Sequence, residues 1–231
     1  MRVLFKWVKA LMAVALLAGT PVCAQTLVAG KDFQLITPPQ PTPPGKNIEV
    51  IEFFWYGCPH CAHLQPSFAD WLKKKPADVA FRSQPAAFDE NWTQLARTFF
   101  AIDVTGSQEQ LHHQLFDAIH KSKKLNPAAL VKDPKGLFDW VGTQKVDSKK
   151  FTEAYNSFSV VSKTQRTVDT TAAYGVNGTP ALAIDGRFLI APSMTPLKAN
   201  NMVDYERFFK NVDQDRKSTR LNSSHVALSR M

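Results

Sequence analysis

The residues best suited to chemistry are two cysteines with two residues between them, in the sequence Cys58-Pro59-His60-Cys61. They follow an apolar run and open a stretch with helical periodicity, so Cys58 is expected at the first position of a helix. There it faces unpaired backbone N–H groups and the positive end of the helix dipole, and both favour thiolate over thiol. The pair therefore predicts dithiol–disulfide exchange, with Cys58 as the nucleophile and the more enclosed Cys61 as the resolving thiol.

The two residues between the cysteines fit the same chemistry. Pro59 suits the first turn of a helix, and His60 can supply a donor or a charge to the thiolate. A pKa of Cys58 about 3 units below its ordinary value would stabilise the reduced form by about 4 kcal/mol near neutral pH. This corresponds to a rise in reduction potential of about 90 mV, which makes the disulfide a strong oxidant.

Two other uses of such a cysteine pair are open. With His60 and His63 it resembles half of a zinc site, but zinc sites usually take further ligands from a second cluster, and the sequence has no second cysteine pair. A structural disulfide at this short spacing would be strained. His112, His113 and His120 include two adjacent residues that cannot share a helix face, so they are expected on a solvated helix surface. No metal site is predicted.

The pattern around the motif predicts an α/β domain that is interrupted by helices. Strands are expected at 32–36, 48–56, 79–82, 181–184 and 187–190, the last two joined by a turn at Asp185-Gly186. Helices are expected from Cys58 onward with Pro66 inside, throughout 91–175, and at 204–212. Within 91–175, residues 161–174 are expected to form one helix that ends at Gly175. A helical insertion into one α/β domain explains this order simply.

The formal charge of +8 does not indicate a nucleic-acid-binding protein, because it is concentrated at the two ends of the chain. Residues 25–214 carry 21 Lys and Arg against 19 Asp and Glu. No nucleic-acid partner is therefore expected.

The first 24 residues are typical of a cleaved secretory signal. Arg2, Lys6 and Lys9 form a positive start, an apolar stretch at 10–18 follows, and Val22-Cys23-Ala24 places small residues before a cut at Gln25. The apolar stretch is far short of the ~20 residues that span a bilayer. Cleavage removes Cys23, so an exported, soluble protein with two cysteines is expected.

The last 17 residues, 215–231, are polar and show no periodic apolar stripe. They resemble a translated sequencing adapter or assembly read-through, so a non-native tail without packing is expected there.

Over roughly residues 30–212 the chain resembles the DsbA family of bacterial periplasmic thiol–disulfide oxidoreductases. The resemblance is carried by Cys58-Pro59-His60-Cys61, by the helical insertion, and by Gly178-Thr179-Pro180 before a hairpin. Glu52-Phe53-Phe54 also matches the family's strand, and Pro66 matches a proline found across thioredoxin-like folds. The resemblance implies a thioredoxin-like fold with an inserted all-helical domain.

The same resemblance implies roles for three further residues. Glu52 would be a buried acid that relays a proton for Cys61, although an ordinary edge-facing carboxylate is the alternative. Pro180 would be cis and face the disulfide, and the backbone of Thr179 would pair with an extended substrate peptide.

Trp55, Tyr56 and Trp92 are candidates for a hydrophobic groove that binds unfolded chains, but Trp55 suits the core equally well.

The expected organisation, in chain order, is: 1–24 signal peptide; 25–46 N-terminal strand and Pro-rich linker; 47–90 first segment of the thioredoxin-like domain; 91–175 helical insertion; 176–214 second segment of the thioredoxin-like domain; 215–231 non-native tail.

The function that the resemblance implies is donation of the Cys58–Cys61 disulfide to newly exported proteins in the periplasm. Its partners would be reduced or unfolded exported proteins and a DsbB-like membrane quinone reductase that reoxidises it. This chain itself would be a monomer without a cofactor. The alternatives are a periplasmic reductase or isomerase and, in another class, an exported metal-binding module. Residues 25–46 are too short for the N-terminal dimerisation domain of such isomerases.

Overall fold

The computed structural model describes residues 27–45 and 47–228, with side chains as far as residue 216. The expected signal peptide at 1–24 lies outside the described residues and stays a prediction. Among the residues that the structure describes, no helix is both long and apolar enough to cross a membrane.

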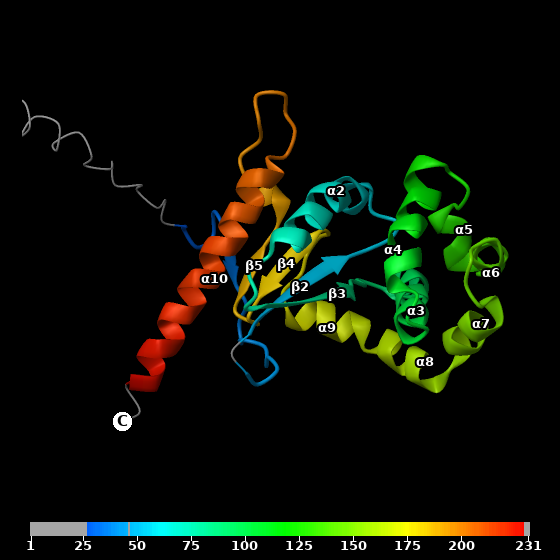
Figure 1. The fold of residues 1–231 in the computed structure, drawn as a ribbon, viewed down its shortest axis with the longest axis horizontal. Coiled ribbons are helices and arrows are strands. Elements are labelled where there is room, and N and C mark those ends of the chain that lie inside the picture. Colours follow the sequence, from blue (N-terminus) through cyan, green and yellow to red (C-terminus); the bar gives the residue numbers. More distant parts are fainter. Residues whose placement is uncertain (1–26, 46, 229–231) are drawn as a thin grey trace, which may run out of the picture.

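A five-stranded sheet with the order β1-β5-β4-β2-β3 forms the centre of the fold (Figure 1). The strands are β1 Gln34–Leu35, β2 Ile48–Phe54, β3 Val79–Pro85, β4 Ala181–Ile184 and β5 Phe188–Ile190. Strand β2 is buried along its whole length and runs parallel to β3 and antiparallel to β4. Burial on both faces explains why its sequence is so rich in apolar and β-branched residues.

Two strands are shorter than the sequence predicts. The strand expected at 48–56 ends at Phe54, so Trp55 and Tyr56 belong to the turn before the cysteines. The strand expected at 32–36 is limited to the two residues of β1. The expected hairpin is confirmed, because β4 and β5 pair antiparallel and Asp185 and Gly186 both have positive φ.

Helices α2, Pro59–Lys74, and α10, Tyr205–Leu228, cover one face of the sheet (Figure 1). Their aromatic side chains stack in the core, with ring centroids 5.8 Å apart for Phe68 and Phe209 and 5.4 Å apart for Trp71 and Phe209. The opposite face packs against the chain after helix α9, where the rings of Phe53 and Tyr174 are 5.1 Å apart. The sheet thus lies between two layers, and Pro59 begins the helix that carries the cysteine motif.

The helical insertion lies between β3 and β4 in the chain. Its elements are α3 Glu90–Val104, α4 Gln108–Phe116, the π-helix η2 Asp117–Lys121, α5 Pro127–Lys132, α6 Lys135–Gly142, α7 Ser148–Asn156, α8 Phe158–Gln165 and α9 Thr167–Ala173. One hydrophobic cluster joins the insertion to the end of β2 and includes Cys58 and Cys61. The expectation of an α/β sheet with a helical insertion is confirmed.

The single helix expected at 161–174 is wrong, because α8 ends and α9 begins at Arg166. The backbone bond from Arg166 N to Ser162 O is long, at 3.4 Å. The hydroxyls of Thr167 and Thr171 donate to the carbonyl oxygens four residues back, at 3.1 and 2.8 Å. Such bonds compete with the helical backbone pattern and bend helices. Gly175 follows α9 with a φ of +65°, as expected of a residue that ends a helix.

The closing helix is longer than the expected 204–212, since α10 continues to Leu228. The absence of packing expected for the tail is wrong for its first two residues, because Asp215 and Arg216 are both buried. Arg216 Nη1 lies 2.6 Å from Asp78 Oδ2, beside the start of β3. Whether 215–231 is native sequence stays a prediction.

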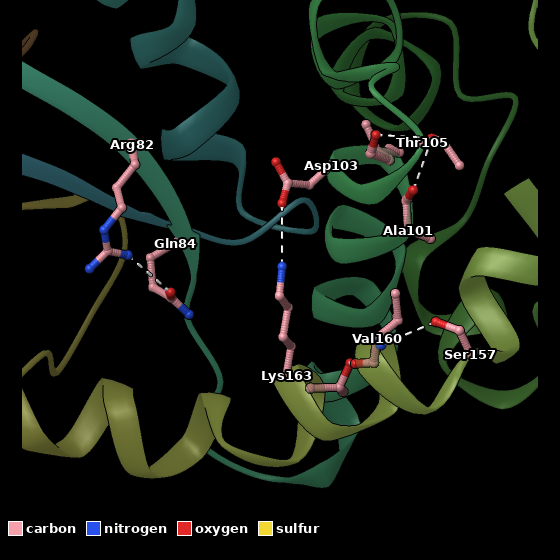
Figure 2. Close-up of polar contacts among 10 residues, drawn as sticks. Arg82, Gln84, Ala101, Asp103, Thr105, Ser157, Val160 and Lys163 are labelled. Carbon is pink, nitrogen blue, oxygen red and sulfur yellow. Dashed lines mark hydrogen bonds and ion pairs between the residues drawn. The ribbon is translucent and has the colours of Figure 1, made fainter.

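A cavity of about 460 Å³ separates strand β3 from the helical insertion, away from the cysteines. Figure 2 shows two of its polar contacts: Lys163 Nζ reaches Asp103 Oδ2 at 3.6 Å, and Arg82 Nη1 donates to Gln84 Oε1 at 3.3 Å. The cysteine chemistry therefore takes place elsewhere, at the end of β2.

Candidate active site

Cys58 lies at the junction between the turn that follows β2 and helix α2. It is the N-cap residue, with φ −84° and ψ 116°, and Pro59 is the first helical residue. The expectation that Cys58 occupies the first helical position is therefore wrong by one residue. The N-cap still borders the unpaired N–H groups of the first turn. Cys58 is only 8% exposed and Cys61 is fully buried, and both are free thiols in this structure.

The surroundings of Cys58 favour its thiolate and lower its pKa to about 5. The largest cause is a hydrogen bond from the Cys61 thiol, which burial of Cys58 opposes. The Thr179 side chain and the backbone N–H groups of Cys61 and His60 add smaller stabilising contributions. Helix N-terminal donors thus act on the sulfur as the sequence predicts.

Cys61 is in the opposite situation. Burial raises its pKa well above the ordinary value, its hydrogen bond with Cys58 raises it further, and the negative charges of Cys58 and Glu52 add to the rise. Cys61 therefore stays a thiol at a pH where Cys58 is already a thiolate. The two sulfurs, three residues apart, therefore suit different steps of exchange: Cys58 can attack and leave as a thiolate, and Cys61 holds a proton.

Glu52 is completely buried on the central strand β2. Its carboxylate accepts hydrogen bonds from Gln65 Nε2 at 3.2 Å and Ser83 Oγ at 3.1 Å. Burial nevertheless raises its pKa to about 7. The alternative of an edge-facing carboxylate is wrong, because β2 lies between β3 and β4. A carboxyl group that titrates near neutral pH next to a buried thiol can exchange protons with it.

Thr179 and Pro180 face the motif from the loop before β4. The Thr179–Pro180 peptide bond is cis, as expected. The Cys58 thiol donates to the Thr179 carbonyl oxygen, with a distance of 3.3 Å from Sγ to O. A thiolate cannot donate, so in that state the Thr179 side chain is the group of this loop that stabilises the sulfur.

A cavity of about 210 Å³ opens beside this loop. Its lining includes His60, Gly178, Thr179, Pro180 and Tyr205. The His60 side chain is exposed, and its influence on the Cys58 pKa comes from its backbone N–H. Pro59 is likewise exposed at the helix start. The structure thus brings together all seven residues that the sequence singles out for the site.

The histidines of the insertion do not all lie on a solvated surface. His113 is exposed, but His112 is only 7% exposed and lies with Nδ1 2.8 Å from the Tyr56 hydroxyl. His120 is half-buried, with Nε2 2.7 Å from the Tyr56 carbonyl oxygen. The expectation is wrong for His112 and His120, whose spacing of eight residues puts them on one helix face. That spacing is the feature of the sequence that indicates that the two histidines lie on the same side of the helical segment.

One of the three aromatic residues expected to line a groove lies in the core instead. Tyr56 is 1% exposed and belongs to the core, so it cannot line a surface groove. The rings of Trp55 and Trp92 contact each other at a tilt of 32°, with centroids 4.1 Å apart. The Trp92 ring also contacts the Phe88 ring, with centroids 4.8 Å apart. The Trp55 ring covers Gly57 so closely that a Cβ there would lie 2.3 Å from it. Gly57 is therefore required for the turn that leads to Cys58.

Opposite acidities in one cysteine pair, placed at a helix start on a thioredoxin-like sheet, are the properties of a thiol:disulfide oxidoreductase, and the protein is of that class. The chain belongs to the DSBA-like thioredoxin domain family, which matches residues 49–200.

Relatives with known names agree with this class. The thiol:disulfide interchange protein DsbA of Burkholderia cepacia is 35% identical over 187 residues, which cover 80% of this chain and 86% of that protein. DsbA of Pseudomonas aeruginosa is 35% identical over 198 residues, which cover 85% and 92%.

Two solved structures have the same fold. The crystal structure of Pseudomonas aeruginosa DsbA has a TM-score of 0.75 and 29% identity, and covers 86% of this chain and 97% of that one. The oxidoreductase DsbA from Xylella fastidiosa has a TM-score of 0.75 and 27% identity, and covers 85% and 100%. The expected fold, family and thiol:disulfide exchange are thereby confirmed.

Proposed function

We propose that this chain is an oxidant, which donates a Cys58–Cys61 disulfide to pairs of thiols in exported proteins. The single observation that supports this direction is the opposite shift of the two cysteine pKa values, Cys58 down to about 5 and Cys61 well above its ordinary value. A stabilised Cys58 thiolate stabilises the reduced form, and this makes the oxidised form ready to accept electrons.

The exchange has two steps. A substrate thiolate attacks Cys58 Sγ, a mixed disulfide forms, and the Cys58–Cys61 bond breaks. The sulfur of Cys61 leaves with the electron pair and takes up a proton, for which the Glu52 carboxyl group is the donor. The second thiolate of the substrate then attacks the substrate sulfur that is bonded to Cys58 Sγ, and Cys58 is released as a thiolate. The substrate loses two electrons and the protein gains them.

Substrate docking is assigned to the loop opposite the motif. The cavity beside Thr179 and Pro180 gives an extended peptide room to lie against the loop, and Pro180 places no backbone N–H near the sulfur. Main-chain groups of Thr179 would pair with the peptide. His60 lines the same cavity and contributes its backbone N–H to the thiolate.

The cellular setting belongs to the same proposal. An N-terminal signal at 1–24 would export the chain to the periplasm, where reduced or unfolded proteins arrive. A DsbB-like membrane quinone reductase would reoxidise the dithiol. The protein would act as a monomer and without a cofactor.

The test is a titration of thiolate absorbance in the reduced protein, followed by its redox equilibrium with glutathione. The expected midpoint is near pH 5, with an equilibrium that strongly favours the reduced protein. A midpoint near the ordinary value for cysteine, or an equilibrium that favours the oxidised protein, would contradict an oxidant and favour a reductase.

A further inference from the structure

Tyr56, two residues before the nucleophile, is held at both ends by histidines from the helical insertion. Its hydroxyl lies 2.8 Å from His112 Nδ1 on α4, and its carbonyl oxygen lies 2.7 Å from His120 Nε2 on the π-helix η2. In Figure 1 the chain that leaves β2 runs toward α4 before it turns back into α2. Two segments that are more than 50 residues away in sequence thus anchor the same residue.

The chemistry of the two contacts differs. A carbonyl oxygen only accepts, so His120 Nε2 carries a proton and donates it. The contact between His112 and the Tyr56 hydroxyl joins two neutral groups, because burial lowers the His112 pKa to about 3 and raises the Tyr56 pKa well above its ordinary value. The contact between His112 and Tyr56 therefore persists across the neutral range without a change of charge.

The position of Tyr56 decides where Cys58 begins. Only Gly57 separates them, and Gly57 has no side chain with which to anchor itself. The Cys58 N–H donates to the Trp55 carbonyl oxygen at 3.0 Å, which closes the turn on its other side. The donors that stabilise the sulfur lie on α2 and on the Thr179 loop, so the turn must bring Cys58 to them.

We propose that His112 and His120 are positioning residues of the redox centre: by holding the hydroxyl and the carbonyl of Tyr56, they fix the turn that aligns Cys58 Sγ with its hydrogen-bond donors. Neither histidine touches the reacting sulfurs, so they act through Tyr56. The inference rests on the proposed function, in which Cys58 is the nucleophile.

The decisive experiment compares His120→Ala with His120→Gln and with His113→Ala. Glutamine can donate from nearly the place of Nε2, and His113 is the exposed neighbour on α4. In His120→Ala the thiolate midpoint should rise by about one pH unit, and the glutathione equilibrium should shift about tenfold toward the oxidised protein. His120→Gln should restore both values to within about twofold, and His113→Ala should leave them unchanged.

A second variant keeps the test sharp if His120→Ala does not fold. Tyr56→Phe keeps the ring in the core and removes only the hydroxyl that meets His112, and we expect a shift of about threefold in the same direction.

A merely structural role predicts a different result. Every folded variant would then lose the same stability in its oxidised and reduced forms and would titrate with the wild-type midpoint, and this outcome overturns the inference. It is distinguishable from a failure of the proposed function, because that failure already appears in the wild-type titration.

Discussion

The two ends of the first turn of α2 surround their sulfurs in opposite ways. At Cys58 the sulfur meets donors: the Cys61 thiol, backbone N–H groups and the Thr179 hydroxyl. At Cys61 it meets apolar surroundings and the nearby acid Glu52. The difference teaches that the motif alone does not divide the chemistry between its cysteines; the N-cap position and the central strand do so. Five predictions test this contrast and the role of the acid beside it, and the first has the largest expected effect.

Replacing each cysteine separately should give two different failures. Cys58→Ser removes the attacking and leaving sulfur and should abolish exchange with a peptide that carries two thiols. Cys61→Ser keeps an accessible nucleophile without its resolving partner, so a preformed mixed disulfide with a peptide that carries a single thiol should persist. Mass spectrometry of unreduced samples distinguishes the outcomes. Equal behaviour of the two variants would show that the contrast between the cysteines is not functional.

The stability of the reduced form should depend on pH in a way that the oxidised form does not share. The Cys58 pKa of about 5 lies below its ordinary value of 9.0, so its thiolate stabilises the folded reduced protein fully above about pH 9. This contribution falls as the pH is lowered and is lost below about pH 5. Urea unfolding of the reduced and the oxidised protein, at intervals of roughly one pH unit between pH 4 and 9, measures this contribution. Parallel profiles would contradict the lowered pKa.

Glu52→Gln should reduce the dependence of the free energy of unfolding on pH between about pH 4.5 and 7. Burial raises the pKa of Glu52 to about 7 from 4.5, so the wild-type protein loses stability as the pH rises from about 4.5 through 7. The glutamine variant should avoid this loss, which amounts to about 3 kcal/mol. None of the causes involves the cysteines, so the oxidised protein is the cleaner sample.

The same variant should also react more slowly in exchange, because Cys61 then lacks its proton donor. Stopped-flow kinetics with the dithiol peptide measures this. An unchanged rate together with a flattened stability profile would place Glu52 outside the proton transfer.

The smallest expected effect comes from Thr179→Val. It removes the hydroxyl that stabilises the thiolate but keeps the carbonyl that accepts from the thiol. The Cys58 pKa should rise by less than one unit, and the glutathione equilibrium should shift about threefold toward the oxidised protein. Thr179→Ser, which keeps a hydroxyl, is the control and should behave as wild type. A shift of equal size in both variants would assign the effect to packing.

Much of the fold could be predicted from local patterns. The apolar run of β2, the hairpin with Asp185-Gly186 and the helix after the motif are each specified by a few neighbouring residues. Local patterns failed where the partner is distant in sequence. The burial of His112 depends on Tyr56, 56 residues away, and that of Arg216 on Asp78, 138 residues away.

The site shows the same division. The spacing of Cys58 and Cys61 and the helix start predict which sulfur attacks, since both are local properties. That Cys61 donates to Cys58, and that Gln65 and Ser83 bond to Glu52, depends on how α2 packs against the sheet. Side-chain contacts between elements are not written in the spacing of either element.

The continuous cluster that runs from the cysteines into the insertion has a consequence for the modularity of the protein. An insertion with a core of its own can be excised or exchanged between relatives without harm to its host. Here the apolar environment of Cys61 is built partly from the inserted helices, so a chimaera with a foreign insertion would inherit the motif but not its chemistry. Substitutions in these helices are therefore expected to change the electron affinity of an unchanged Cys-Pro-His-Cys sequence.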